Sequence, residues 1–444
     1  MEKSSTSMFL GNIQIPPLPL NAPPVRSLPV RQPLRSFILS IATLLSPLLS
    51  QARAADQPKF AWKNGDRVVL IGDTLIEREQ AQGYLETLLT ARNPDKSITF
   101  RNLGWSGDTV FGTAQAGFGT PTEGFKHVVD HVLALKPTVL ILGYGMAESF
   151  DGKAGLPAFT TGFNTLLDAL SPTNARLIFL SPIAHEDLGR PLPDPTNHNL
   201  SLDMYRDAIK SIAHSRKAHF IDLYAATRPP LAQKNGPLTD NGIHPTPYGY
   251  WSLANLIAAD LCPESEAERD IHIDVHNSKT SPNRAKSIKV DDLEVSPDQI
   301  HFSLTAPRLP LSLPPKNVPS PASRTLTLSS LPPGIFKLAI DGKAITSASS
   351  ESWSKGVAVT PGPEFEAVDA LRKAVIAKNE LYFYRWRPQN ETYLFGFRKH
   401  EQGNNASEIP KFDPLVETLE KEIASLRLSR PHAYVLTRES KAAK

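Results

Sequence analysis

The sequence predicts an α/β fold whose main domain, residues 55–264, is built on a parallel five-stranded sheet. Five short runs rich in Val, Ile, Leu and Phe lack strict alternation, and stretches with helical spacing separate them. Such runs are typical of strands covered on both faces, and repeated strand–helix–strand units imply parallel pairing. The expected strands are RVVLI (67–71), ITFRNL (98–103), TVLILG (138–143), RLIFLS (176–181) and HFIDLY (219–224).

The helices expected between these strands follow from the spacing of apolar residues. Residues 76–89 predict one helix after the first strand, and the segments around 156–170 and 204–212 predict two more. In a parallel sheet, ligands bind at the carboxyl ends of the strands. We therefore expect the chemistry in the loops that follow residues 71, 103, 143 and 181.

Residues 1–54 predict a signal peptide with a Pro-rich leader. An apolar run at 37–49 follows three arginines and precedes Ala52-Arg53-Ala54, which has the small residues that signal peptidase reads. The run is too short for a spanning helix, although a retained signal-anchor is the alternative. We expect an exported protein, periplasmic or extracellular and cleaved near Ala54, with no stable membrane span afterwards.

The rest of the chain is close to neutral, with 43 basic and 44 acidic residues after position 54. It therefore has no general attraction for nucleic acid or anionic membranes. The single cysteine, Cys262, excludes an intrachain disulfide framework and a cysteine-based zinc cluster. We expect no cofactor and no metal, and the sequence gives no oligomeric state.

Two further segments follow the main domain. Residues 265–363 predict a Pro-rich β module, because 11 of the 40 prolines lie within 297–363 beside short alternating runs. Residues 364–444 predict helices around a block dense in aromatic residues and arginines, 381–405. This block suits packing, sugar stacking or a protein contact.

Candidate chemistry appears in four blocks of the main domain. Gly72-Asp73-Thr74 ends the first strand, where Thr74 is a nucleophile or a plain helix cap. The block NLGWSGDT (102–109) indicates either backbone N–H groups turned toward a ligand or an ordinary tight turn. The third block is GYGMAES (143–149). In DNGIHP (240–245), His244 lies just before a helix, where Asp240 or Asn241 orients it as a general base.

These four blocks, in this order, resemble the SGNH (GDSL-type) hydrolases over roughly residues 66–262. The resemblance implies a three-layer α/β/α sandwich and hydrolysis of acyl esters, often on sugars or lipids. It places the nucleophile at Thr74, where the family has Ser, and the backbone oxyanion donor at Gly107. It also implies an exported bacterial branch with a long C-terminal extension.

Two further positions of the resemblance depart from the family, besides Thr74. The side-chain oxyanion donor, Asn in the family, falls on Ala147, and the Asp that orients the base falls on Asn241, with Asp240 beside it. An Asn is still able to accept a hydrogen bond from Nδ1–H of His244 but supplies no charge. Arg385, Arg387 or Arg398 would replace the missing donor if the extension folds back over the cleft.

Two hypotheses follow for the main domain. It is a weak or re-tooled hydrolase of small-molecule or glycan esters, including O-acetylated carbohydrate, or a non-catalytic protein that binds a glycan or acyl ligand. In both cases we expect Asp73, Trp105, Tyr144 and Glu148 to line the cleft.

Two weaker patterns lie outside the main domain. His272, Asp274 and His276 alternate, as in a metal site or on a solvated strand edge. Asn390-Glu391-Thr392 fits a glycosylation sequon.

Overall fold

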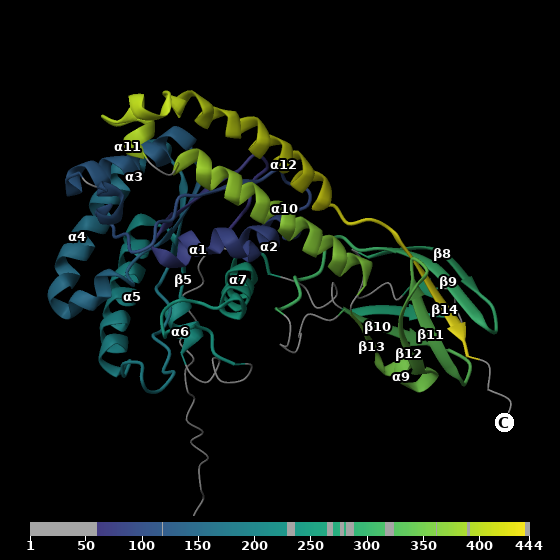
Figure 1. Ribbon diagram of the computed structural model, residues 1–444. Helices are drawn as coiled ribbons and strands as arrows, with labels where there is room; N and C mark the ends of the chain where they lie inside the picture. The colour runs from purple at the N-terminus through teal and green to yellow at the C-terminus, as the bar shows by residue number, and fades with distance from the viewer. Residues whose placement is uncertain are drawn as a thin grey trace, which may run out of the picture. The chain divides into compact units, whose positions relative to one another are not determined.

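The computed structural model describes residues 60–117, 119–228, 236–263, 270–275, 279–280, 288–315, 324–360, 362–388 and 391–439. Its main domain contains a five-stranded sheet in the order β2-β1-β3-β4-β5, with every neighbouring pair parallel (Figure 1). The strands are β1 (Arg67–Gly72), β2 (Thr99–Asn102), β3 (Val139–Gly143), β4 (Arg176–Leu180) and β5 (His219–Ile221). The predicted parallel sheet is confirmed.

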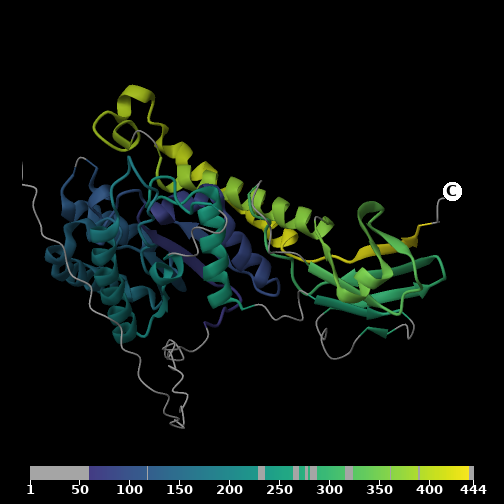
Figure 2. The ribbon, with the colours of Figure 1, turned by 90° about the horizontal axis from the view of Figure 1, so that it is seen from below.

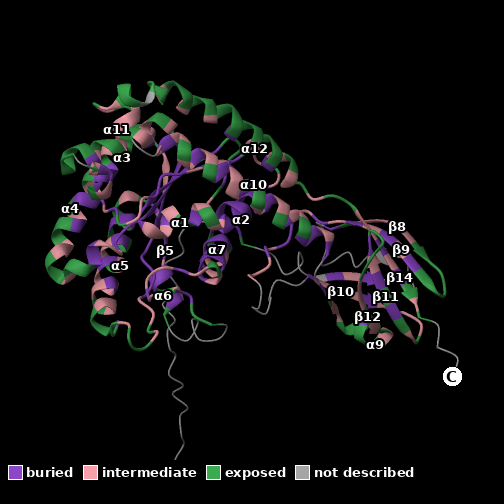
Figure 3. Cartoon of the chain, in the orientation of Figure 1, coloured by how far each residue is buried: buried purple, intermediate pink, exposed green. Residues whose placement is uncertain are grey.

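Helices cover both faces of this sheet, which gives the predicted three-layer sandwich. Alternate strand residues pack in opposite directions: Val68 and Leu70 pack with α1, α2 and α7, whereas Val69 and Ile71 pack with α3, α4 and α5. The strands are accordingly buried along most of their length (Figure 3). The helices are α1 (Thr74–Gln82), α2 (Tyr84–Arg92), α3 (Pro121–Leu135), α4 (Gly152–Leu170), α5 (Thr196–Arg216), α6 (Leu223–Thr227) and α7 (Pro247–Leu261).

Two predicted elements differ in detail. The single helix expected at 76–89 is two helices, because Gly83 adopts φ +64° and its N–H caps the carbonyl of Glu79. This left-handed conformation suits glycine and ends α1. The expected strand 219–224 is shorter, because the Asp222 side chain accepts a hydrogen bond from Ala225 N–H and starts α6.

The β-rich part contains two further sheets. Their orders are β13-β10-β6-β7 and β12-β11-β14-β9-β8. The strands are β6 (Asp270–Asp274), β7 (Lys279–Thr280), β8 (Lys289–Val295), β9 (Gln299–Thr305), β10 (Arg324–Ser329), β11 (Ile335–Ile340), β12 (Lys343–Ser349), β13 (Val357–Val359) and β14 (His432–Arg438), with the short helix α9 (Ser350–Lys355). β14 lies between β9 and β11. The segment 364–444 was expected to be helical, and it also supplies this central strand.

The remaining helices of the C-terminal segment are α10 (Pro363–Trp386), α11 (Glu391–Leu394) and α12 (Phe412–Leu426). Figures 1 and 2 show α10 and α12 running side by side. Val375 of α10, Ala91 of α2 and Ile423 of α12 belong to one apolar cluster. Within it, the buried Lys378 Nζ lies 2.8 Å from Glu86 Oε2 and donates to Phe100 O at 3.0 Å.

Several predictions fall outside the described residues. The signal peptide at 1–54, His276 of the alternating trio and Asn390 of the sequon lie there, so these remain predictions. Among the helices that the structure describes, none has the length and apolar character needed to cross a bilayer. Cys262 is buried and unpaired.

We predict that Lys378→Met destabilises the protein by about 3–5 kcal/mol, because it leaves the Glu86 carboxylate buried without its counterion. The double variant Lys378→Met/Glu86→Leu is expected to recover most of this loss. Urea titration measures both. Lys373→Met is the matched control: its ion pair with Asp369 is exposed and contributes about 1 kcal/mol or less. Equal effects of the two single variants would contradict the role of the buried pair.

Candidate active site

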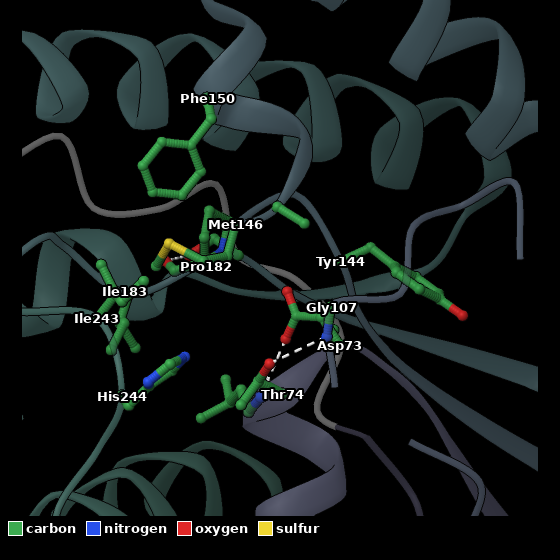
Figure 4. A pocket seen from close by; sticks show the side chains of 14 residues that line it. Asp73, Thr74, Gly107, Tyr144, Met146, Phe150, Pro182, Ile183, Ile243 and His244 are labelled. Carbon is green, nitrogen blue, oxygen red and sulfur yellow. Dashed lines mark hydrogen bonds between the residues drawn. The ribbon is translucent and has the colours of Figure 1, made fainter. Parts of the chain in front are cut away.

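A cavity of about 280 Å³ opens at the carboxyl ends of the parallel strands (Figure 4). Its walls come from the loops after β1, β2, β3 and β4 and from the loop before α7. Each of these segments contributes a lining residue, in order Thr74, Gly107, Ala147, Pro182 and His244. The cavity lies at the strand ends where the sequence predicted the chemistry, and it brings together Thr74 and His244, which are 170 positions apart.

Thr74 is the first residue of α1. Asp73 caps this helix, since its Oδ1 accepts a hydrogen bond from Leu75 N–H at 3.0 Å. Close strand packing at Gly72 fixes the turn: a Cβ at this position would lie 2.3 Å from Gly143 O. The Thr74 hydroxyl therefore lies at the positive end of a helix dipole, which favours negative charge there.

Gly107 directs its backbone N–H to Thr74 Oγ1, at 3.1 Å. Its φ of +72° favours glycine, although a Cβ would meet no atom within 4 Å. The preceding residue, Ser106, donates its N–H to Glu77 Oε2 at 2.5 Å, and this bond ties the loop to α1. The structure thus brings the predicted nucleophile and the predicted oxyanion donor into contact.

The loop that carries His244 is held on two sides. Asp240 N–H donates to His244 O at 3.0 Å, and Thr246 N–H donates to Leu238 O at 2.8 Å. Glu186 accepts hydrogen bonds from the N–H groups of Leu238 and Thr239. The imidazole is thereby held at the cavity wall by the backbone of its own loop.

Asn241 is the residue that contacts the imidazole: its Nδ2 lies 2.9 Å from His244 Nδ1. The expectation that Asn241 accepts from Nδ1–H is wrong, because Oδ1 already accepts from Ile243 N–H at 3.2 Å and His244 N–H at 2.9 Å. Asp240 does not replace the missing carboxylate; its side chain is exposed. Burial and the charge of Arg78 lower the pKa of His244, and Asp240 opposes this.

Three buried carboxyl groups brace the loops around the cavity. Burial raises the pKa of Asp73 to about 7 and that of Glu148 to about 7, and raises the pKa of Asp108 to about 6. Glu148 accepts hydrogen bonds from Val110 N–H at 2.9 Å and Gly145 N–H at 3.0 Å. Glu148 was expected to line the cleft. It lies behind the cavity wall instead, because both of its oxygens are occupied by backbone donors.

Trp105 was also expected in the cleft and is not among the residues that line it. The C-terminal segment covers it: the Arg387 guanidinium lies 3.3 Å from its ring centroid, and Trp386 packs against its edge. Arg387 also donates to Glu77 Oε2 at 2.9 Å. Arg385 and Arg398 pair with Asp413 and Glu401. None of the three arginines therefore replaces the missing oxyanion donor.

The rest of the cavity wall is largely apolar. Tyr144 is among the lining residues, but Figure 4 shows its side chain directed away from the cavity. Sequence reasoning did not name the apolar lining residues, which are Leu75, Met146, Phe150, Pro182, Ile183 and Ile243. Pro182 and Ile183 lie in the loop after residue 181, where the sequence predicted chemistry. No sequence pattern indicated Phe150.

A chain of hydrogen bonds behind the wall was also missed. His185 Nδ1 lies 2.9 Å from His198 Nδ1, and His198 Nε2 lies 2.7 Å from Ser149 Oγ. Ser149 Oγ donates to Met146 O at 2.7 Å, so the His198 ring donates from Nε2 and accepts at Nδ1. Gly242 belongs to the loop of His244, and a Cβ at this position would lie 2.6 Å from the His185 ring. The hydrogen-bonded histidines therefore pack against this loop and support it.

A hydroxyl, an imidazole and a backbone N–H thus line one cavity at the carboxyl ends of the parallel sheet. Residues 70–251 match the model of the GDSL-like Lipase/Acylhydrolase family. The resemblance found in the sequence is thus confirmed. No curated protein sequence matches the chain significantly.

Solved structures with a similar fold include BT4096, a gut microbial diltiazem-metabolizing enzyme. It is 15% identical, with a TM-score of 0.69 over 86% of this chain and 100% of that one. Axe2, an acetylxylan esterase from Geobacillus stearothermophilus, is 19% identical, with a TM-score of 0.36 over 45% of this chain and 94% of that one. LAE5, an alpha/beta hydrolase from the metagenome of Lake Arreo in Spain, is 21% identical, with a TM-score of 0.37 over 46% of this chain and 99% of that one. At these identities the likeness to BT4096 shows the fold alone.

We predict that His198 makes the stability of the protein depend on pH. Burial lowers its pKa from 6.5 to about 4, so the unfolded chain binds a proton between these values that the folded chain does not. The contribution of neutral His198 is complete above pH 6.5 and falls as the pH decreases toward 4. The difference in Tm between wild type and His198→Gln should shrink over this window. The exposed control, His214→Gln, should show no such trend; the same slope in both variants would contradict the assignment.

Proposed function

We propose that the protein is an acyl ester hydrolase with Thr74 as nucleophile, His244 as general base and Gly107 N–H as oxyanion donor. One observation carries this proposal: the three groups line one cavity at the helix N-terminus, and Gly107 N–H already contacts Thr74 Oγ1. The family of the domain supports ester hydrolysis as the reaction class. We further propose that the protein acts after export, on the basis of the sequence of residues 1–54.

The proposed reaction has two steps. Thr74 Oγ attacks the acyl carbon while its proton moves to Nε2 of His244, which accepts it once the ring has shifted its own proton to Nδ1. Gly107 N–H binds the resulting oxyanion. The C–O bond to the alcohol breaks, and the alcohol leaves with the proton from His244. Water then attacks the acyl-threonine and gives a proton to His244. His244 passes this proton to Thr74 Oγ as the C–O bond to threonine breaks and the carboxylic acid leaves. Atoms and charges balance without a further reactant.

Two features make this hydrolase slow. Ala147 supplies no side-chain donor to the oxyanion, and the loss of one such donor costs roughly 10²–10³ in kcat. Asn241 contacts Nδ1 with its NH₂ group, and an Asp-to-Asn change at the corresponding position of a serine protease costs about 10⁴ in kcat. Such losses are not additive when residues act as a unit.

The cavity wall supports esters with an apolar acyl group. Leu75, Met146, Phe150 and Ile183 offer that group apolar surface, and Ala147 adds no polar atom. We propose small-molecule acyl esters as the substrate class, with O-acetylated carbohydrate as one member to be tested.

A second candidate function is binding of a glycan or acyl ligand without turnover. The contact between Asn241 Nδ2 and His244 Nδ1 favours it, because this contact opposes the tautomer that a base needs. The following experiment separates the two functions.

We predict that purified protein hydrolyses p-nitrophenyl acetate slowly and that Thr74→Ala or His244→Ala abolishes the activity. Thr74→Ser should raise kcat, because it removes the methyl group that crowds the attacking oxygen. Thr161→Ala and His214→Ala change exposed residues away from the cavity and should retain wild-type rates. Release of p-nitrophenol and of acetate from acetylated sugars is measured. Turnover that survives both Ala variants would remove the hydrolase proposal and leave ligand binding.

We predict that kcat/KM falls at acidic pH only below the ordinary imidazole pKa of about 6.5. Burial and Arg78 lower the pKa of His244, so its neutral form persists to lower pH. Arg78→Met should move this acid limb to higher pH, and Asp240→Asn should move it to lower pH. Shifts in the same direction for both variants would show that another group controls the limb.

A further inference from the structure

The hydrogen bonds of Asn241 fix which nitrogen of His244 carries the proton. Two backbone N–H groups, from Ile243 and His244, donate to Oδ1 of Asn241. The other end of the amide, the NH₂ group, therefore faces Nδ1 of His244 at 2.9 Å. An amide NH₂ donates and does not accept, so Nδ1 is the acceptor and the neutral imidazole has its proton on Nε2.

The alternative arrangement is unfavourable for a local reason. Rotating the amide by 180° would place its NH₂ group against the two backbone N–H groups and lose both hydrogen bonds. Protonating Nδ1 would place N–H against NH₂. The resting state of His244 is therefore a hydrogen-bond donor at Nε2, and Figure 4 shows the ring entering the cavity near Thr74.

Other groups at this end of the cavity favour a negatively charged ligand. Gly107 N–H donates toward the same space, at the N-terminus of α1. Arg78 is exposed, forms no ion pair with a described residue, and lies close enough for its charge to act on His244. The two neighbouring acids oppose this charge weakly: Asp240 is exposed, and Asp73 Oδ1 is occupied by Leu75 N–H.

The opposite end of the cavity is apolar. Figure 4 shows Met146 and Phe150 there, away from His244, and Phe150 is 60% exposed. A ligand that satisfies both ends has an anionic head with two acceptor oxygens and a short aliphatic tail.

We infer that the cavity binds aliphatic monocarboxylates, with one oxygen of the carboxylate accepting from Nε2–H of His244 and the other from Gly107 N–H. This inference rests on the site of the proposed function but not on its turnover. The carboxylate is also the acid that ester hydrolysis would release, so the resting enzyme would hold its own product.

The test measures binding to the full chain by calorimetry at pH 7, with sodium hexanoate as the probe and hexan-1-ol as the neutral match. Hexanoate should bind roughly 10-fold tighter than the alcohol, because hydrogen bonds to a charged group are the stronger ones. Equal binding of the two probes would show a merely apolar cavity and overturn the inference.

Asn241→Asp provides the matched variant. The aspartate keeps the acceptor for Ile243 and His244 N–H but turns the second atom into an acceptor, so the proton of His244 moves to Nδ1. Hexanoate affinity should fall roughly 10- to 100-fold, because Nε2–H is lost and a negative charge is added. Asn164→Asp, whose side chain faces Arg216 on α4, adds the same charge elsewhere and should leave binding unchanged.

A direct reading of the tautomer needs no variant. The ¹⁵N shifts of the His244 ring should show Nε2–H in wild type and Nδ1–H in Asn241→Asp; Nδ1–H in wild type overturns the inference. Hexanoate binding without ester hydrolysis would remove the proposed function and leave this inference standing. Hydrolysis without preferential hexanoate binding would do the reverse.

Discussion

The geometry of the site depends on buried carboxyl groups that bind the backbone of the loops around it. Asp73 caps α1 and fixes Thr74, and Glu148 binds the N–H groups of Val110 and Gly145, which follow two different strands. A parallel sheet brings the ends of its strands to one edge, but it does not hold the intervening loops. These hydrogen bonds do so, and without them the hydroxyl, the imidazole and the backbone donor would have no fixed separation.

The sequence predicted the sheet and the position of the site because both follow from local patterns. Apolar runs at 67–71 and 138–143 indicated buried parallel strands, and the rule for strand ends located Thr74 and Gly107. The errors arose where distant segments meet. Trp105 reads as a ligand-contacting aromatic residue, yet Arg387, almost three hundred positions later, covers it. No local pattern contains that contact.

The exchange of Asp for Asn at position 241 shows a different limit of sequence reasoning. The sequence reveals that the residue has one oxygen and one NH₂ group, but not which of them faces His244. Two backbone N–H groups of the same loop decide this by occupying the oxygen. The effect of the substitution therefore depends on the conformation of residues 241–244 as much as on side-chain chemistry. In a loop that left Oδ1 free, the same Asn would accept a hydrogen bond from Nδ1–H of the imidazole. Nε2 would then be the nitrogen that accepts.

The contacts of α10 and of Arg387, which follows it, tie the C-terminal segment to the main domain. Lys378 neutralises a carboxylate inside the sandwich, and Arg387 rests on Trp105 in the loop that carries Gly107. An accessory tail joined by a linker is interchangeable, but a tail with its own counterion and ring contacts inside the neighbouring domain is not. Exchanging the region after residue 363 would leave Glu86, Glu77 and Trp105 without these contacts, so the two parts of the chain are not separable modules.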